Sequence, residues 1–166
     1  MDLYLLRHGI AVERGSGGDA NDADRPLTAR GERRVVRIAR GMREFGLAFD
    51  RILTSPYARA ARTAEIVART LRAKNRLRVT EHLASDGDPR ALVREIAGSK
   101  PVPDRVLLVG HEPYLGRLIS TLTTGGGDLD LTLKKGGLCR LTAESLRFGR
   151  CATLRWLLTP AHLARM

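Results

Sequence analysis

The segment LYLLRHGIA, residues 3–11, joins an apolar run to side chains that suit phosphate chemistry. Its four leading apolar residues predict a buried strand, and Arg7, His8 and Gly9 follow at once. A guanidinium binds phosphate oxygens with two N–H groups, and a neutral imidazole, with an ordinary pKa of about 6.5, can attack phosphorus. A glycine lets the backbone turn tightly and lets a phosphate approach. The segment therefore predicts a strand that carries a nucleophile and its anion anchor to the edge of a sheet.

Two later segments have the same organisation, an apolar run followed by polar side chains. DRILTSP ends at Ser55-Pro56 and leads to Arg59, whereas DRVLLVG leads to His111. If the carboxyl ends of these strands share one edge of a parallel sheet, two arginines and two histidines meet there. Cations packed together without a ligand repel one another, and a dianionic phosphoryl group would resolve that conflict.

Each of these residues also has an ordinary structural explanation. Taken alone, Arg7 is a surface cation, and His8 is a structural imidazole as readily as a functional one. Ser55 and Pro56 fit the N-cap and the first residue of a helix, and His111 could satisfy a helix end. The functional interpretation therefore rests on the agreement of their positions along the chain.

Strand-like and helix-like runs alternate, which predicts a largely parallel sheet with helices on both faces. Residues 137–146 and 151–159 change this character and predict an antiparallel pair of strands at the sheet edge. The expected fold class is therefore an α/β three-layer sandwich with a mostly parallel sheet and an antiparallel edge. The predicted strands before that edge are DLYLLR, DRILTSP, RLRVT and DRVLLVG, and the predicted helices begin at Thr28, Ser55, Asp88 and Pro113.

The first predicted helix has two stripes of opposite character. Thr28 is a good N-cap, and Glu32 lies in the first turns. The basic stripe is most simply a solvated helix face, although it could also dock an acidic partner. The apolar stripe consists of Val35, Ile38, Ala39, Met42 and Phe45, and the basic stripe consists of Arg30, Arg33, Arg37 and Arg40.

The length and the charge of the chain limit the classes of function. A chain of 166 residues suits one domain, residues 1–166, which can bury enough surface without a disulfide or a metal. The formal net charge is +11, and the basic residues, almost all Arg, are spread along the chain. Only three Phe, three Tyr and one Trp are available to stack on bases. We expect a basic surface that attracts acidic partners or phosphorylated substrates, rather than a nucleic-acid groove.

Other motifs lack the context that their chemistry requires. The histidines at positions 8, 82, 111 and 162 have no metal-ligand spacing, so no metal is expected. GSGGDA, residues 15–20, matches G-x-G-x-x-G/A but lies in a polar loop rather than between a strand and a helix, which argues against dinucleotide binding. LKKGG is not a phosphate-binding P-loop.

The composition also bears on location. No apolar run approaches the roughly 18 residues that a membrane span needs, and the chain starts directly with strand-like sequence. We therefore expect neither a membrane anchor nor a secretory signal. Cys139 and Cys151 fit a reduced cytoplasmic protein better than a disulfide framework, although they could form a bridge if they face each other across a hairpin.

Three segments resemble the signatures of the histidine phosphatase superfamily, which has the phosphoglycerate mutase-like fold. They are LLRHGIA, LTSPYARAARTAEI and VLLVGHEPYL, and their order, each after a strand, makes the resemblance specific. The short chain and the segments DADRPLTARG and LASDGDPRAL are most similar to the bacterial phosphohistidine phosphatases of the SixA type. The resemblance extends from Leu3 to about Pro160, nearly the whole chain.

The resemblance implies a role for each residue of the predicted cluster. His8 would be the nucleophile that carries a transient phosphoryl group, and water would then release inorganic phosphate. Arg7, Arg59 and His111 would hold the phosphoryl oxygens and neutralise the charge of the transition state, without a metal or another cofactor. Ser55 would lie near the pocket and supply a supporting hydrogen bond.

Two further residues are weaker candidates. Arg25, in DADRPLT, could help to shape a loop over the site or could equally be a salt-bridge partner within that loop. Many superfamily members carry a glutamate after the third strand that donates a proton to the leaving group. Glu81 has that residue type and follows the strand, whereas Asp88 fits a helix cap better. The phosphohistidine phosphatases generally lack a clear equivalent.

The resemblance implies a hydrolase in signal transduction that removes phosphate from phosphohistidine on a protein, with a histidine-containing phosphotransfer domain as the expected partner. The lack of large insertions predicts a shallow, open site. The nearest alternative is a phosphomonoesterase for small molecules, whereas the mutases of this fold are longer and enclose their substrate. The non-enzymatic alternative is a basic module that binds phosphate or nucleic acid, and it should keep its affinity when His8 is replaced by Ala.

Overall fold

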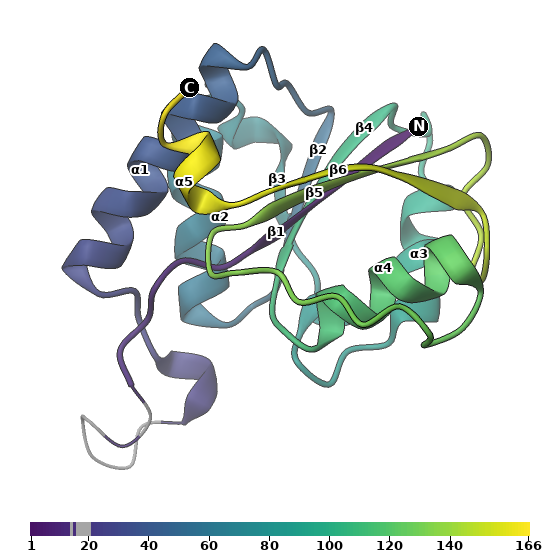
Figure 1. Ribbon diagram of the computed structural model, residues 1–166, viewed down its shortest axis with the longest axis horizontal. Helices are drawn as coiled ribbons and strands as arrows, with labels where there is room; N and C mark the ends of the chain where they lie inside the picture. The colour runs from purple at the N-terminus through teal and green to yellow at the C-terminus, as the bar shows by residue number, and fades with distance from the viewer. Residues whose placement is uncertain (14, 16–20) are drawn as a thin grey trace.

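The computed structural model describes residues 1–13, 15 and 21–166 and contains a six-stranded sheet with helices packed on it (Figure 1). The GSGGDA match lies, apart from Gly15, outside the described residues. The strands are β1 (Asp2–Arg7), β2 (Arg51–Thr54), β3 (Leu77–Val79), β4 (Arg105–Gly110), β5 (Leu138–Ala143) and β6 (Ala152–Leu158). The helices are α1 (Ala29–Glu44), α2 (Ala58–Thr70), α3 (Pro89–Ala97), α4 (Tyr114–Thr124) and α5 (Pro160–Leu163), with short 3-10 helices η1 (Asp22–Asp24), η2 (Lys74–Arg76) and η3 (Glu81–Leu83).

The strand order across the sheet is β3-β2-β4-β1-β5-β6. Strand β4 pairs in parallel with both β1 and β2, and β2 pairs in parallel with β3. Strand β5 pairs antiparallel with β1 and with β6, so the C-terminal hairpin forms one edge. The predicted three-layer α/β fold with a mostly parallel sheet and an antiparallel edge is therefore confirmed.

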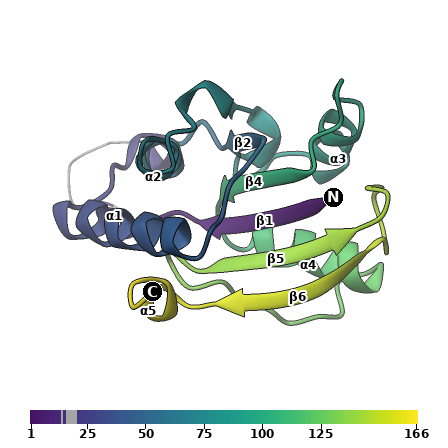
Figure 2. The same cartoon turned by 90° about the horizontal axis from the view of Figure 1, so that it is seen from above.

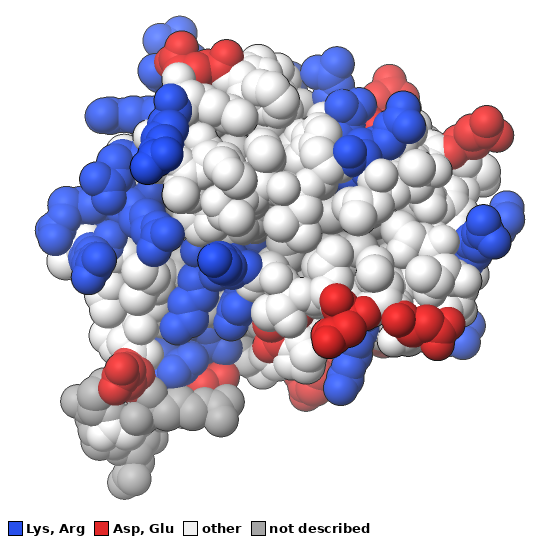
Figure 3. Space-filling view, in the orientation of Figure 1, with Lys and Arg blue, Asp and Glu red and all other residues white. Residues whose placement is uncertain are grey.

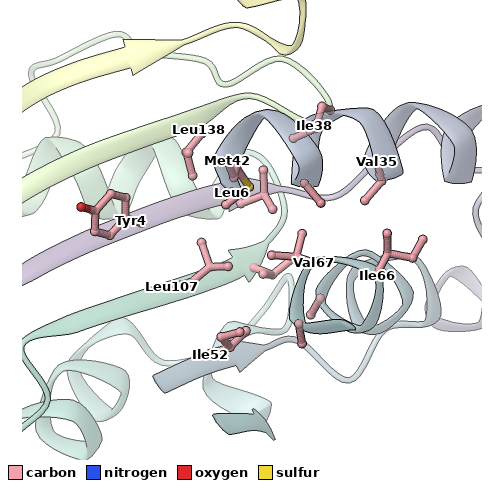
Figure 4. Close-up of a cluster of buried hydrophobic side chains, with 14 of the residues drawn as sticks. Tyr4, Leu6, Val35, Ile38, Met42, Ile52, Ile66, Val67, Leu107 and Leu138 are labelled. Atoms are coloured by element: carbon pink, nitrogen blue, oxygen red, sulfur yellow. The ribbon is translucent and has the colours of Figure 1, made fainter. Parts of the chain in front are cut away.

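Alternate residues of the central strands face opposite helical layers. Tyr4 and Leu6 pack in the core with residues of α1, α2 and α5, whereas Leu3 and Leu5 pack with residues of α3 and α4. Figure 2 shows α1 and α2 on one side of the molecule and α3 and α4 on the other. In Figure 4, side chains of α1 and α2 meet those of β1 and β4 in the first of these cores. Because both faces are covered, the strands are continuous apolar runs.

Helix α1 has the predicted start and the predicted stripes. The Thr28 side chain caps it by accepting a hydrogen bond from the backbone N–H of Gly31 (2.9 Å). Phe45 lies just past the last helical residue, is 47% exposed and meets the edge of the Trp156 ring. The other apolar residues of the stripe, Val35, Ile38, Ala39 and Met42, are buried, and the four arginines Arg30, Arg33, Arg37 and Arg40 are exposed.

The start of α2 differs from the prediction. Ser55 is not the N-cap, because α2 begins at Ala58 and Tyr57 is its N-cap. The Ser55 hydroxyl accepts a hydrogen bond from the backbone N–H of Tyr57 (3.2 Å) and contacts His111 Nε2 (2.8 Å). Ser55 is fully buried, so its hydroxyl serves a turn and a neighbouring imidazole instead of the first turn of the helix.

The predicted helix starts at Asp88 and Pro113 are confirmed, since these residues are the N-caps of α3 and α4. The sequence analysis missed α5 and the path of residues 125–137, which connect α4 to β5. The backbone N–H of Leu129 donates to the hydroxyl of Ser120 on α4 (3.0 Å). The connection therefore lies back against α4 before it enters the sheet.

Both cysteines are free thiols, Cys139 in the core and Cys151 partly buried. Burial raises the pKa of the Cys139 thiol to about 12, so it remains protonated at neutral pH. In the described part of the chain, no helix combines the length and the apolar character that crossing a bilayer requires.

Candidate active site

The carboxyl ends of β1, β2 and β4 meet at one edge of the sheet. The backbone N–H of His8, just after β1, donates to the carbonyl of Gly110 at the end of β4 (3.0 Å). The N–H of Ser55, just after β2, donates to the carbonyl of Val109 (3.0 Å). These bonds continue the ladders of the parallel strands and hold the following residues side by side. We call Arg7, His8, Arg59 and His111, which gather at this edge, the basic cluster.

The His8 imidazole is only 5% exposed, and its two nitrogens have different surroundings. Nδ1 lies 2.7 Å from the carbonyl oxygen of Gly9, which can only accept, so Nδ1 carries the proton. Nε2 therefore keeps its lone pair, and the Nε–H of Arg59 donates to it over 3.3 Å. Burial lowers the pKa of His8 to about 4; the Gly9 carbonyl opposes this shift and the charge of Arg59 adds to it. The imidazole is therefore neutral near pH 7, as a nucleophile must be.

The His111 imidazole lies beside that of His8, with 5.1 Å between the ring centroids, and is 2% exposed. Its Nε2 is 2.8 Å from the Ser55 hydroxyl, and the Tyr57 ring lies against it with centroids 4.9 Å apart. Among the described residues, its Nδ1 has no hydrogen-bond partner although it is buried. Burial, followed by the neighbouring His8 and Arg59, lowers the pKa of His111 to about 3.

Arg59, on α2, is 4% exposed and is held by a carboxylate that the sequence analysis missed. Its Nη2 donates to Asp22 Oδ2 (2.9 Å), and its Nη1 donates to the backbone carbonyl of the same residue. The charge of Asp22 also reaches His111, whose pKa it raises against the dominant effect of burial. The outer N–H groups of Arg59 are thus engaged by η1, while its Nε–H faces Nε2 of His8.

Arg7, at the end of β1, is held by uncharged backbone. Its Nη1 donates to the carbonyl of Leu133 (2.7 Å), in the buried part of the α4–β5 connection. The N–H of Leu133 donates to Glu112 Oε1 (2.7 Å), and Glu112 Oε2 accepts from the N–H of Gly116 (3.1 Å). Gly136 completes this support by donating its N–H to the carbonyl of Arg7 (3.0 Å). Glu112 therefore holds the Leu133 peptide, and the carbonyl of that peptide in turn holds the Arg7 guanidinium.

Gly9 joins the end of β1 to both neighbouring helices. Its N–H, which a phosphate could have bound, donates instead to Thr63 Oγ1 (3.1 Å) on α2. A Cβ at this position would lie 2.6 Å from Cγ2 of Val35 on α1. The missing side chain of Gly9 therefore allows the turn after β1, which carries His8, to pack directly against α1.

The two weaker candidates have different positions. Arg25 pairs with Asp22 (Nε to Oδ1, 3.0 Å) and donates to the carbonyl of Val12 (3.2 Å), so it is a salt-bridge partner within its loop. Glu81 is exposed on η3. In the part of the chain that the structure describes, no hydrogen bond or ion pair joins the Glu81 carboxylate to the basic cluster.

Three charged residues near the cluster escaped the sequence analysis. Asp22 and Glu112 lie within recognised segments, but their partners are 37 and 21 residues away along the chain. Lys135, on the α4–β5 connection, is exposed, and its charge contributes to the lowered pKa of His8. The available signal was that Asp22 belongs to DADRPLT and that Glu112 follows His111, although neither position identifies what the carboxylate binds.

Two guanidiniums, two neutral imidazoles and one loop carboxylate thus surround the carboxyl edge of the sheet. Such a set of hydrogen-bond donors suits a dianionic oxyanion, and the lone pair of His8 Nε2 suits attack on its central atom. Among the described residues, no group of three or more His, Cys, Asp or Glu is placed to hold a metal ion.

Comparisons with known proteins agree with this arrangement. The sequence model of the histidine phosphatase superfamily (branch 1) matches residues 3–84, which include Arg7, His8 and Arg59. An uncharacterized protein of Picosynechococcus sp. is 38% identical over 148 residues, 89% of this chain and 88% of that protein. The phosphohistidine phosphatase SixA of Escherichia coli K12 is 26% identical, over 98% of this chain and 96% of that protein.

A solved structure has the same architecture. The protein histidine phosphatase SixA complexed with tungstate superimposes with a TM-score of 0.83 at 24% identity, covering 98% of this chain and 99% of that chain. The chain belongs to the histidine phosphatase superfamily, and it is a phosphatase of the hydrolase class.

Proposed function

We propose that this phosphatase hydrolyses phosphohistidine on a protein, through a phosphohistidine intermediate formed at its own His8. The observation that carries the proposal is the contact between the unprotonated Nε2 of His8 and the Nε–H of Arg59 (3.3 Å). This contact supports the proposal because the lone pair of Nε2 lies next to an N–H group suited to a phosphoryl oxygen, with further donors around it.

In the first step, His8 Nε2 forms a bond to phosphorus while the P–N bond of the substrate breaks. The other ring nitrogen of the substrate phosphohistidine takes a proton from solvent, because the pKa of an imidazolium lies near neutrality, and the substrate histidine then leaves as a neutral imidazole. This leaving group has little need of a strong protein acid, which fits the position of Glu81 outside the cluster. Arg7 and Arg59 stabilise the oxygens of the transferring group as charge spreads over them.

Ser55 and His111 act as a pair in this proposal. If the Ser55 hydroxyl donates to His111 Nε2, the proton of the neutral imidazole lies on Nδ1. The buried Nδ1 then offers a donor to a phosphoryl oxygen. The role of Ser55 is to select this tautomer of His111. The supporting hydrogen bond expected from the sequence therefore acts on the imidazole and not on the substrate.

In the second step, a water oxygen attacks phosphorus, the bond to His8 Nε2 breaks, and inorganic phosphate leaves. Nδ1 keeps its proton through both steps because the Gly9 carbonyl holds it. His8 therefore returns to the same tautomer, ready for the next substrate.

A protein substrate, with a histidine phosphotransfer domain as the partner, is supported by the SixA relative, which matches this chain over nearly its full length. The same proposal places the enzyme in signal transduction and in the cytoplasm, where thiols such as Cys139 and Cys151 remain reduced. The second candidate is a phosphomonoesterase for small molecules, since the donor set recognises the phosphoryl group and not the group attached to it.

A substrate panel tests the proposal. The wild-type enzyme is given a phosphohistidine protein, a sugar phosphate, a nucleotide and a phosphotyrosine peptide, and phosphate release is measured for each. We expect the highest kcat/KM for the phosphohistidine protein, and an acid-labile, base-stable label on the enzyme after rapid quenching. His8→Ala should lose turnover and labelling but retain affinity for tungstate. A label on serine would assign the nucleophile elsewhere, and a preference for the sugar phosphate would favour the second candidate.

A further inference from the structure

The outer side of α1 carries a row of arginines, which we call the arginine face: Arg30, Arg33, Arg37 and Arg40. All four are exposed, and no hydrogen bond or ion pair engages their side chains within the described part of the chain. Figure 3 shows Lys and Arg side chains gathered at the left, over α1 in the orientation of Figure 1. Among the residues that the structure describes, no acidic side chain forms an ion pair with this basic surface.

The two acidic residues of α1 are engaged elsewhere. Glu32 binds Arg62 of α2 (2.6 Å), and Glu44 binds Arg43 at the end of the helix (3.2 Å). Arginines three and four residues apart on one helix repel each other and destabilise it. Fold stability therefore does not account for the arginine face, and a function on the surface is the better explanation.

The arginine face begins beside the nucleophile. The N–H of Thr28, the N-cap of α1, donates to the carbonyl of Ile10 (2.9 Å), two residues after His8. Gly31 packs so closely on this carbonyl that a Cβ there would lie 2.1 Å from the oxygen. A molecule whose phosphoryl group lies at His8 can therefore reach the N-terminal turn of α1 and continue along the helix.

The length of the row indicates the size of its partner. The ten residues from Arg30 to Arg40 span about 15 Å of helix, several times the width of a phosphoryl group. A small phosphomonoester held at the basic cluster covers little of this distance, whereas the folded surface around a phosphorylated side chain can cover all of it. Helix α1 itself carries no aromatic residue, and Phe45, just past its end, packs against Trp156, so the row lacks the series of aromatic rings that stacking on successive bases uses.

We infer that the arginine face docks an acidic surface of the protein that carries the phosphohistidine, so that charge complementarity along α1 selects the substrate. The inference rests on the proposed function and adds the recognition element to it. Charges at the rim of an interface act mainly by speeding encounter and are screened by salt. The arginine face should therefore control kcat/KM for a protein substrate and leave the chemistry unchanged.

The test compares two substrates of the same chemistry and different size. One is an acidic histidine phosphotransfer domain phosphorylated on its histidine, and the other is free phosphohistidine. For the triple variant Arg33→Gln, Arg37→Gln, Arg40→Gln, we expect kcat/KM on the domain to fall about tenfold at about 50 mM salt. The loss should shrink at about 500 mM salt, and kcat/KM on free phosphohistidine should stay within about twofold of the wild type.

A matched control removes the same charge far from the site. The triple variant Arg147→Gln, Arg150→Gln, Arg155→Gln changes arginines of the β5–β6 hairpin and of β6, and Arg150 and Arg155 are exposed. Equal losses in the two triple variants would attribute the effect to net charge and overturn the inference. A loss in the α1 variant on both substrates, or on neither, would overturn it as well.

The proposed function and this inference fail in different ways. A wild-type enzyme that hydrolyses neither form of phosphohistidine refutes the proposed function. Binding of the unphosphorylated acidic domain, measured by fluorescence anisotropy, still tests the arginine face in that case: binding weakened in the α1 variant alone supports docking. Domain binding unchanged in the α1 variant, together with loss of binding to a short RNA, would assign the face to nucleic acid instead.

Discussion

The two arginines of the basic cluster lie in regions of the molecule that support them by different means. Arg59 projects from α2 and binds the carboxylate of Asp22, whose side chain is 27% exposed, on η1. Arg7 ends β1 and binds the backbone carbonyl of Leu133, which is fully buried and fixed by Glu112. A carboxylate competes with a phosphoryl group for the same N–H donors, whereas a buried carbonyl of the fold does not. We therefore expect Arg7 to be preorganised for substrate and Arg59 to exchange partners when substrate binds.

Both arginines should nevertheless be indispensable for turnover, and their removal is the largest effect that we predict. Arg7→Ala and Arg59→Ala should each lower kcat/KM by on the order of 10²–10³, because each removes donors to the transition state. Arg62→Ala is the control on α2: its side chain is 41% exposed and pairs with Glu32, so kcat/KM should change by less than about threefold. Equal losses for Arg59→Ala and Arg62→Ala would show that the wrong arginine has been assigned.

The two imidazoles between these regions make stability depend on pH. The pKa of His8 and that of His111 are lowered in the folded state, to about 4 and about 3, against about 6.5 when unfolded. Between pH 6.5 and 4 the unfolded chain binds more protons, so the free energy of unfolding falls as pH falls. From pH 7 to pH 4.5 each imidazole should lower the free energy of unfolding by on the order of 2 kcal/mol, which changes the unfolding equilibrium about 30-fold.

Urea unfolding at pH 7 and pH 4.5 measures this difference for the wild type, His8→Asn and His111→Asn. Each variant should lose less stability than the wild type on acidification, because it no longer buries that imidazole. If all three proteins lost the same amount of stability on acidification, these two histidines would not be the groups that control stability at low pH.

Glu112 should matter through the position of Arg7. Gln offers one carbonyl oxygen to the two N–H donors that the Glu112 carboxylate accepts, those of Leu133 and Gly116. Glu112→Gln should therefore shift the Leu133 carbonyl and lower kcat about tenfold, with a smaller change in KM. The loss should disappear when Arg7 is already Ala and should persist in the Arg59→Ala background, as a double-mutant cycle would show. Additive losses in both backgrounds would reduce Glu112 to a general structural residue.

Much of this architecture follows from local sequence patterns. The buried strands are continuous apolar runs, α1 starts at its Thr28 cap, and α3 starts at Asp88, because each depends on residues within a few positions. The meeting of His8, Ser55 and His111 follows from a topological rule, that the carboxyl ends of parallel strands share an edge. For this reason the site residues predicted from the sequence lie at the end of a strand, as Arg7 does, or within a few residues after one.

The residues that support the cluster could not be predicted in the same way. Asp22, Leu133 and Glu112 are paired by loops whose paths depend on packing, and no periodicity encodes such paths. The misplaced N-cap has a similar cause: Ser55 has a good cap residue type, but a long-range contact with His111 takes its hydroxyl. Glu81 follows its strand as expected, yet η3 leaves it exposed.

The smallest effect that we predict tests the exchange of partners at Arg59. Asp22→Asn keeps the shape of the side chain and removes its charge, so an oxyanion no longer displaces a carboxylate from the guanidinium. The inhibition constant for tungstate should fall roughly three- to fivefold, which is a small part of the energy of a charge-assisted hydrogen bond. Asp24→Asn, an exposed neighbour in η1 with the same change of charge, is the control and should alter this constant less than twofold. Weaker tungstate binding in Asp22→Asn would show that the carboxylate positions Arg59 for the oxyanion instead of competing with it, and the two arginines would then be equally preorganised.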